Sequence, residues 1–242
     1  MQKLIDGVRH FYRGPFAQNR PFFERLAARS QQPIALIITC ADSRVHPNLI
    51  TQTEPGELFL LRNAGNIVPP HGAGGSEAAT IEYSLEVLGI SDIIICGHSQ
   101  CGAIQALLDQ QRITHLPAVQ RWCEHAEATR RIVQQKYGSR LASEVAEAAA
   151  QENVLVQLNH LETHPAVAVR LKTDAVRLYG WYYDIGAGTV AQYYPARNAF
   201  LPLTDERLPA QIAPAGDHQA APPGGRALNI QEGPRNELTH RS

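Results

Sequence analysis

Three thiol or imidazole side chains stand where two short apolar segments end. Cys40 follows the apolar run of residues 34–39, and His98 and Cys101 follow a second run, residues 92–96, in the turn G-H-S-Q-C-G. An H-x-x-C turn can supply two metal ligands from one tight loop, and Cys40 would supply a third from a neighbouring strand. Two thiolates and an imidazole form a soft donor set that suits zinc. Three protein ligands leave the fourth tetrahedral position to water or substrate, which is the pattern of a catalytic zinc site.

A carboxylate and a guanidinium follow Cys40 in the segment C-A-D-S-R. Asp42 and Arg44 are two residues apart in a predicted loop, so Arg44 can hold Asp42 through two hydrogen bonds and keep it ionised. An ionised carboxylate beside a metal-activated water would accept a hydrogen bond from it and direct its oxygen toward an electrophile. The same two residues also fit an ordinary loop salt bridge, which contributes about 0–1 kcal/mol at a surface.

A nucleophilic Cys40 is the alternative chemistry. Phosphatase loops place an arginine six residues after the thiol, where this sequence has His46, and rhodanese-type loops place it five residues after, where it has Val45. Neither pattern matches. A lone buried cysteine can also be a small apolar side chain and nothing more, and Cys123, in a helical stretch without a partner motif, fits that description.

The elements that must position these residues follow an α/β pattern. Continuous apolar runs at 34–39, 57–61 and 92–96 are typical of strands buried on both faces. Residues 74–89 predict a helix between the last two. Crossovers of this length indicate parallel strands, and hence an α/β fold with a mostly parallel central sheet and flanking helices. Ligands bind at the carboxyl ends of such strands, so the three candidate ligands converge if the first and third strands are neighbours.

The two ends of the chain differ from this core. Residues 2–12 and 19–29 predict two helices, the first ended by Pro15 and the second begun by Asn19 as N-cap. We expect residues 1–30 to form a helical arm that packs on a partner. Residues 102–172 are mostly helical, and 177–184 with 189–194 predict a hairpin. Residues 204–242 contain five Pro and four Gly. They predict a flexible tail and leave 1–203 as the folded domain.

Composition narrows the class of protein. The chain has 242 residues, and its 22 Lys and Arg nearly balance 23 Asp and Glu, which argues against a dedicated nucleic-acid binder. No apolar run approaches the ~20 residues of a membrane helix, and Asp6 and Arg9 interrupt the segment that a signal peptide would need. Four cysteines do not make a disulfide scaffold. We expect a cytoplasmic protein with no nucleic-acid or membrane partner.

Three segments resemble the signature segments of the β-class carbonic anhydrases. They are C-A-D-S-R-V at 40–45, R-N-A-G-N at 62–66 and G-H-S-Q-C-G at 97–102. The resemblance covers about residues 1–203, which would be the catalytic domain. It implies one Zn²⁺ per subunit on Cys40, His98 and Cys101, with Asp42 and Arg44 as the catalytic pair. The implied reaction is the reversible hydration of carbon dioxide to bicarbonate and a proton.

The same resemblance implies a substrate pocket. Its lining residues would be Phe59, Ala64, Tyr83 and Gly102, and Gln31 would reach in from the neighbouring subunit. Since such pockets form at a dimer interface in the family, the chain is expected to be a homodimer or a higher homo-oligomer.

Two further features refine the resemblance. Ile37 stands three residues before the first ligand, where the bicarbonate-regulated branch has tryptophan, so the chain resembles the plant-like branch with an intact Asp–Arg pair. The N-terminal segment, A-E-A-T-R-R at 126–131 and Y-G-W-Y-Y-D at 179–184 resemble the carboxysomal carbonic anhydrases of cyanobacteria. This implies a place inside carboxysomes, a supply of carbon dioxide to carbon fixation, and a carboxysome scaffold protein as a candidate partner.

Two alternatives to carbon dioxide hydration stay open. A hydrolase of carbon disulfide or carbonyl sulfide could use the same site on the same fold. A non-catalytic, zinc-stabilised scaffold module is the other, and Asp42, Arg44 and Gln31 argue against it because a purely structural zinc needs no orienting pair.

Overall fold

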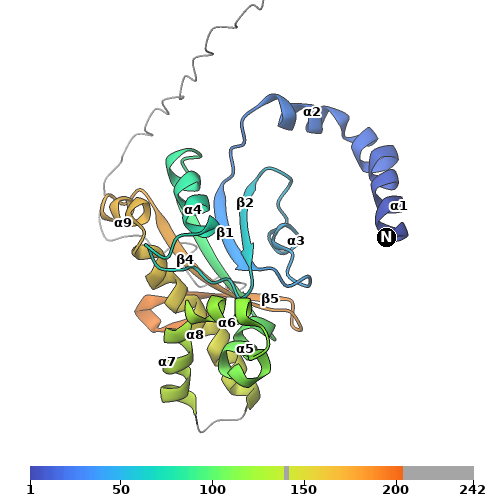
Figure 1. Cartoon of the computed structure of the whole chain (residues 1–242). Helices are drawn as coiled ribbons and strands as arrows, with labels where there is room; N and C mark the ends of the chain where they lie inside the picture. The colour runs from blue at the N-terminus through green and yellow to red at the C-terminus, as the bar shows by residue number, and fades with distance from the viewer. Residues whose placement is uncertain (139–141, 204–242) are drawn as a thin grey trace, which may run out of the picture. The chain divides into compact units, whose positions relative to one another are not determined.

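A six-stranded sheet forms the centre of the computed structural model, which describes residues 1–138 and 142–203 (Figure 1). The strand order is β2-β1-β3-β4-β5-β6. The first four strands in this order pair in parallel, and the last two pairings are antiparallel. The strands are β1 (Ala35–Cys40), β2 (Leu58–Asn63), β3 (Asp92–His98), β4 (Arg177–Asp184), β5 (Thr189–Tyr194) and β6 (Ala199–Pro202).

The predicted α/β class and its mostly parallel sheet are confirmed. The apolar runs at 34–39, 57–61 and 92–96 coincide with strands except for Ile34 and Glu57, which precede them, and each strand extends one or two residues beyond the end of its run. Cys40 and His98 are therefore the last residues of β1 and β3 rather than the first residues after them. The predicted hairpin is formed by β4 and β5.

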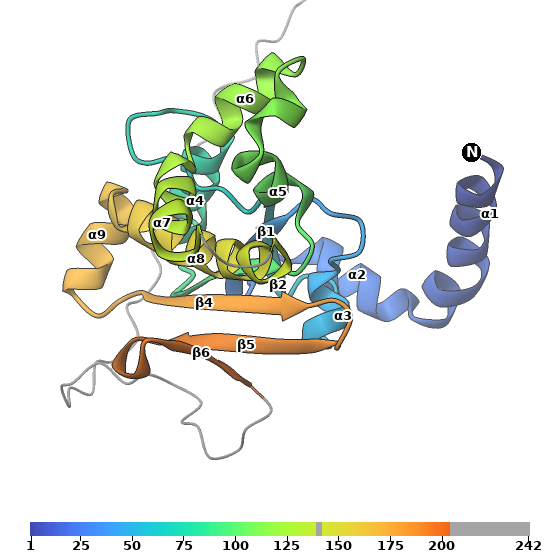
Figure 2. The same cartoon turned by 90° about the horizontal axis from the view of Figure 1, so that it is seen from below.

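Most of the helices follow β2 along the chain, and Figure 2 shows α4, α8 and α9 on one side of the sheet. They are α4 (Ser76–Glu86), α5 (Gly102–Leu108), α6 (Pro117–Glu124), α7 (Glu127–Tyr137), α8 (Ala142–Glu162) and α9 (Pro165–Lys172), with a short α3 (Pro47–Thr51) between β1 and β2. None of the helices in the described ranges is both long and apolar enough to cross a bilayer.

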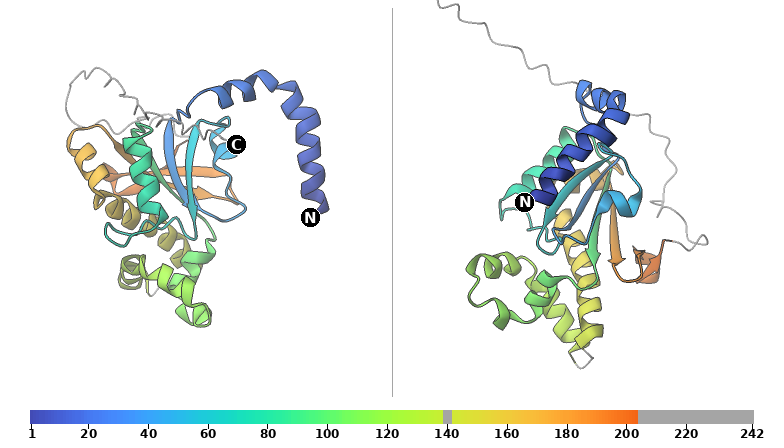
Figure 3. Two further views of the ribbon diagram at one scale, coloured as in Figure 1. Left: turned by 45° about the horizontal axis from the view of Figure 1, so that its top comes forward. Right: turned by 90° about the vertical axis from the view of Figure 1, so that its right-hand side faces the viewer.

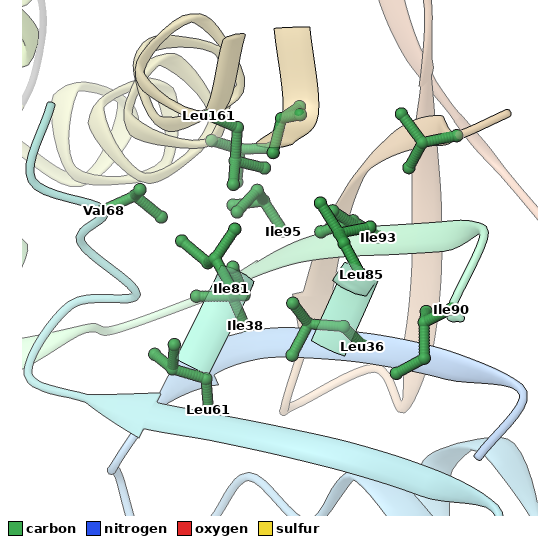
Figure 4. Close-up of a cluster of buried hydrophobic side chains, with 13 residues drawn as sticks. Leu36, Ile38, Leu61, Val68, Ile81, Leu85, Ile90, Ile93, Ile95 and Leu161 are labelled. Atoms are coloured by element: carbon green, nitrogen blue, oxygen red, sulfur yellow. The ribbon is translucent and has the colours of Figure 1, made fainter. Parts of the chain in front are cut away.

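The main core lies between this helical layer and the sheet. Alternate residues of β1 and β3, such as Leu36 and Ile93, point into it and meet Ile81 and Leu85 of α4 and Leu161 of α8 (Figure 4). All five are fully buried, and burying one such side chain stabilises the fold by about 1.5–3 kcal/mol. The intervening residues of the same strands pack in a smaller cluster on the opposite face, which explains why the strands read as continuous apolar runs.

Helix α8 packs directly on the sheet at two glycines. A Cβ on Gly97 of β3 would come within 2.8 Å of Val154 on α8, and a Cβ on Gly180 of β4 within 2.9 Å of the same side chain. No larger residue fits at either position without moving the helix. This close approach brings the polar side chains of α8 within reach of the loop after β2.

The N-terminal arm consists of α1 (Gln2–Phe11), a π-helical turn (Tyr12–Phe16) and α2 (Arg20–Ala28). The prediction that Pro15 ends the first helix is wrong, because Pro15 lies inside the π-helical turn. A wider turn relieves the clash between the proline ring and the preceding carbonyl. Asn19 stands at the N-cap position of α2, but its side chain donates to the carbonyl of Pro15 at 3.2 Å and caps nothing.

The arm carries an apolar stripe that nothing among the described residues covers. Aromatic rings join its pieces, with Phe23 5.5 Å from Phe11 and 5.3 Å from Phe16 between ring centroids. No residue of α1 or α2 is buried, and Leu4 and Val8 are 66% and 69% exposed. In Figure 3 the arm leads into β1 apart from the helices that cover the sheet. The predicted packing of this arm on a dimer partner stays a prediction.

Candidate metal centre

Cys40, His98 and Cys101 converge at the carboxyl ends of β1 and β3. The two strands are hydrogen-bonded neighbours, which was the condition for convergence. The three potential ligand atoms lie within 4.8 Å of one another, and all three residues are buried. Within the described ranges this is the one group of three or more such side chains placed to hold a metal ion.

The orientation of His98 leaves one ring nitrogen free for a ligand. Its Nδ1 lies 2.8 Å from the carbonyl oxygen of Ser99, and since a carbonyl only accepts, Nδ1 carries the proton. Nε2 then keeps its lone pair, and it is buried without a hydrogen-bond partner. An unpaired buried polar atom is costly, and a metal ion is the partner that this arrangement fits.

The two sulfurs have the spacing that a single tetrahedral ion requires. The Sγ atoms of Cys40 and Cys101 are 3.9 Å apart, and two sulfurs on one zinc ion at about 2.3 Å lie about 3.8 Å apart. The contact between the two sulfurs lowers the pKa of Cys40, and the same contact, together with burial, raises the pKa of Cys101. A divalent cation lets both ionise. The donor set therefore fits zinc.

A backbone amide supports the first of these ligands. The N–H of Gly65 donates to Sγ of Cys40 at 3.3 Å. Gly65 has a φ of +82°, and a Cβ there would approach Ala103 to 3.0 Å, so this position requires glycine. The segment R-N-A-G-N at 62–66 thus reaches the metal centre through its backbone.

Asp42 and Arg44 form the predicted bidentate pair beside the ligands. Arg44 donates from Nε to Oδ1 at 3.0 Å and from Nη2 to Oδ2 at 2.7 Å, and its backbone N–H adds a third hydrogen bond of 3.0 Å to Oδ1. The Arg44 side chain holds the pKa of Asp42 well below its usual range. Oδ2 lies 4.0 Å from Nε2 of His98. An ionised acceptor therefore stands next to the three ligands.

Comparison with known proteins decides the family. Residues 35–190 match the carbonic anhydrase family. A carbonic anhydrase of Synechocystis sp. is 48% identical over 195 residues, which are 80% of this chain and 71% of that protein. The solved structure of the β-carbonic anhydrase CcaA superposes with a TM-score of 0.82 at 46% identity, covering 84% of this chain and 98% of the other.

The chain belongs to the β-class carbonic anhydrases. This membership makes it an enzyme and supports carbon dioxide hydration as its reaction. A structure from the ascomycete Sordaria macrospora, one of two described as tetrameric β-carbonic anhydrases, is 28% identical, with a TM-score of 0.72 over 79% of this chain and 95% of that one.

Arg62 of this carbonic anhydrase has a role that its sequence does not announce. Its guanidinium donates to the carbonyl of Cys40 from Nε at 3.1 Å and from Nη2 at 2.9 Å, and Nη2 also reaches the carbonyls of Asp42 and Val45, each at 2.9 Å. It therefore fixes the loop that carries the first ligand and the acceptor. The signal of such a role in the sequence was an arginine directly after the apolar run 57–61, at the start of the R-N-A-G-N segment.

The predicted pocket residues of the carbonic anhydrase fall into two groups. Ala64 and Gly102 lie beside the metal centre, because Ala64 precedes Gly65 and Gly102 follows Cys101. Phe59 lies elsewhere: it pairs with Leu36, four residue pairs before Cys40 and Asn63, or about 13 Å along the strand. The ring of Tyr83 lies 6.1 Å from that of Phe59, and Tyr83 is 44% exposed.

Gln31 also lies away from the metal centre of its own chain. It precedes β1, whereas Cys40 ends it, so the length of the strand separates them. Its side chain lines a surface cavity of about 510 Å³ together with Leu26 and Glu54. One chain therefore does not bring Gln31, Phe59 or Tyr83 to its own Cys40, His98 and Cys101, and the predicted pocket stays a prediction that needs a second subunit.

Proposed function

We propose that this carbonic anhydrase hydrates carbon dioxide reversibly, to bicarbonate and a proton, with one zinc ion held by Cys40, His98 and Cys101. The observation that carries the proposal is the unpartnered Nε2 of His98, which faces two sulfurs 3.9 Å apart with a carboxylate 4.0 Å away. When bound, zinc supplies a water acidic enough to act as a nucleophile near neutral pH.

The chain's own residues orient that chemistry. Asp42 can only accept hydrogen bonds while it is ionised, and Arg44 keeps it so. Arg44 also donates to the carbonyl of Gln100 at 3.2 Å, which ties the loop of Asp42 to the turn that carries His98 and Cys101. The acceptor is thus held in place relative to all three ligands. A site that only stabilised a fold would have no use for such an oriented acceptor.

Metal analysis and a stopped-flow assay on the purified full chain test this function. We expect one zinc per subunit and rapid hydration of carbon dioxide. Parallel assays with carbonyl sulfide and carbon disulfide separate the alternatives: turnover of these in place of carbon dioxide would mean a hydrolase. A zinc-containing protein inactive on all three substrates would mean a scaffold module.

We further propose that the pocket is completed across a homodimer. The separation of Gln31 and Phe59 from the metal centre of their own chain supports this, as does the exposed stripe of α1. Exposed apolar surface of this kind marks interaction sites.

The dimer predicts that charges on the stripe separate the subunits and stop turnover. Leu4→Asp with Val8→Asp should give a monomer in analytical ultracentrifugation, and hydration should fall at least about tenfold because the pocket loses its partner residues. Lys3→Asp with Gly7→Asp places the same carboxylates one position away and should stay dimeric and active. A fully active monomer would contradict the shared pocket.

We also propose that the enzyme works inside carboxysomes, where it supplies carbon dioxide to carbon fixation and docks on a scaffold protein through residues 204–242. The similarity to a cyanobacterial carbonic anhydrase supports the location, whereas the docking role is proposed from the composition of the tail alone. Residues 204–242 lie outside the described ranges, and their assignment as a tail rests on their composition.

Truncation after Leu203 tests the role of the tail. The cut keeps all six strands and the last hydrogen bond of the sheet, from the N–H of Leu203 to the carbonyl of Val190 at 2.9 Å. The truncated enzyme should therefore keep its zinc, its dimer and its hydration rate, while a fluorescent fusion should lose its place in the compartment. An inactive truncated enzyme would mean that the tail is part of the catalytic fold. Normal localisation of the truncated enzyme would mean that residues 1–203 alone direct it to the compartment.

A further inference from the structure

We propose that Trp122 is a positioning residue of the metal centre: it fixes the peptide whose N–H donates to the Cys40 sulfur, and so slows the loss of the metal. The inference rests on the proposed zinc site and goes beyond the ligands themselves. It concerns α6, an element that contributes neither a ligand nor a member of the Asp42–Arg44 pair.

The contact runs through a single peptide unit. Nε1 of Trp122 donates to the carbonyl oxygen of Ala64 at 2.8 Å. That carbonyl and the N–H of Gly65 belong to the same planar peptide group, so fixing one end fixes the other. The N–H of Gly65 points to Sγ of Cys40 at 3.3 Å. Trp122 is therefore one peptide away from a metal ligand.

The next peptide is held independently by α8. Asn153 is fully buried, and its Nδ2 donates to the carbonyl of Gly65 at 3.0 Å. Its Oδ1 accepts from Thr129 at 3.1 Å and from Gln157 at 2.9 Å. The close packing of α8 on Gly97 and Gly180 sets the position of this side chain. Both peptides that flank the Gly65 Cα are thus fixed by side chains from helices, which holds its positive φ in place.

A donor aimed at Cys40 matters because the metal binds the thiolate and not the thiol. Hydrogen bonds to an ionised acceptor are stronger than those between neutral groups, and a peptide whose carbonyl is hydrogen-bonded becomes a better donor at its N–H. Loss of the Trp122 contact weakens and loosens the Gly65 donor. Partners of this kind change metal affinity by about 10–100-fold, and we expect the lower end because Trp122 acts through an intervening peptide.

The chain offers a matched control for this contact. It has two tryptophans, and Nε1 of Trp181 donates to Oε1 of Gln192 at 3.1 Å. In the purified holoenzyme, Trp122→Phe should shorten the half-time of zinc release to an excess of chromophoric chelator by about tenfold, whereas Trp181→Phe should leave it within about twofold of the parent. With cobalt in place of zinc, the thiolate-to-cobalt charge-transfer band should shift in Trp122→Phe alone.

A second variant separates the N–H from the ring, since phenylalanine also changes packing against His125, whose ring centroid lies 5.7 Å from that of Trp122. In the Trp181→Phe background Trp122 is the remaining indole, so incorporation of benzothienylalanine replaces its N–H with sulfur and keeps its shape. Zinc release should be accelerated as in Trp122→Phe. Release at the parent rate would overturn the proposal and assign any effect of phenylalanine to packing. A parent protein that takes up neither zinc nor cobalt would instead overturn the proposed metal site.

Discussion

Replacing Cys101 by serine is expected to remove both the metal and the activity of this enzyme. Serine keeps the size and position of the side chain but does not form the thiolate that zinc prefers. The site would then offer one sulfur and one imidazole, and Nε2 of His98 would lack the ion that its burial calls for. Loss of a ligand should exceed the effect of losing a supporting partner, so zinc affinity should fall by more than about 100-fold.

Cys123→Ser is the matched control for this substitution. Cys123 is also buried, but it lies outside the metal cluster, and burial raises the pKa of its thiol. Zinc content after dialysis against a weak chelator, together with hydration rates, should separate the two variants. Full zinc in Cys101→Ser would refute the assignment of the ligands.

Asp42→Asn is expected to keep the zinc and lose most of the turnover. The amide has the shape of the carboxylate but only one acceptor oxygen, so it cannot accept both Nε and Nη2 of Arg44 and still serve a water at the metal. We expect hydration to fall at least tenfold, which corresponds to about 1.4 kcal/mol or more in the barrier. The loss should appear in kcat, because no ligand has been changed.

A surface pair provides the comparison for Asp42. Asp109 accepts from Nε of Arg112 at 2.8 Å, and both side chains are exposed. Asp109→Asn removes a similar ion pair far from the ligands and should leave kcat unchanged. Unchanged turnover in Asp42→Asn would mean that the Asp42–Arg44 pair only stabilises the loop.

The ligands could be predicted from the sequence because the apolar runs mark where the strands end. Continuous apolar runs located β1 and β3 to within two residues, and parallel strands place their carboxyl ends at one edge, so Cys40, His98 and Cys101 had to meet if the strands were neighbours. The role of Arg62 could not be predicted because its partners are main-chain carbonyls, which carry no sequence signal. The hydrogen bond from Asn153 to Gly65 could not be predicted because the two residues are 88 positions apart, and no local pattern links them.

Two further features, the turn in the N-terminal arm and the substrate pocket, could not be predicted from the sequence. Pro15 predicts a helix end by its own chemistry, but a π-helical turn accommodates it, in a segment whose aromatic rings contact one another. The distance of Phe59 and Tyr83 from the ligands depends on the register of β2 against β1. Neither property can be read from residue types along a single segment.

The turn that carries His98 and Cys101 is also tied to the β4–β5 hairpin. The N–H of Ser99 donates to the carbonyl of Tyr183 at 2.9 Å, and Oγ of Ser99 accepts from the N–H of Ile185 at 3.0 Å.

These hydrogen bonds determine when, during synthesis of the chain, the metal centre can be fully assembled. All three ligands have been translated at residue 101, but the groups that hold them in place come later, at Trp122, Asn153 and the hairpin around Tyr183. At about 5–20 residues per second, a ribosome needs about 4–16 s to add the roughly 80 residues between Cys101 and the hairpin. During that interval the nascent chain carries Cys40, His98 and Cys101 without the residues that hold them in place in the folded chain. The hydrogen bonds that hold the three ligands in place are therefore complete only after the hairpin has been synthesised.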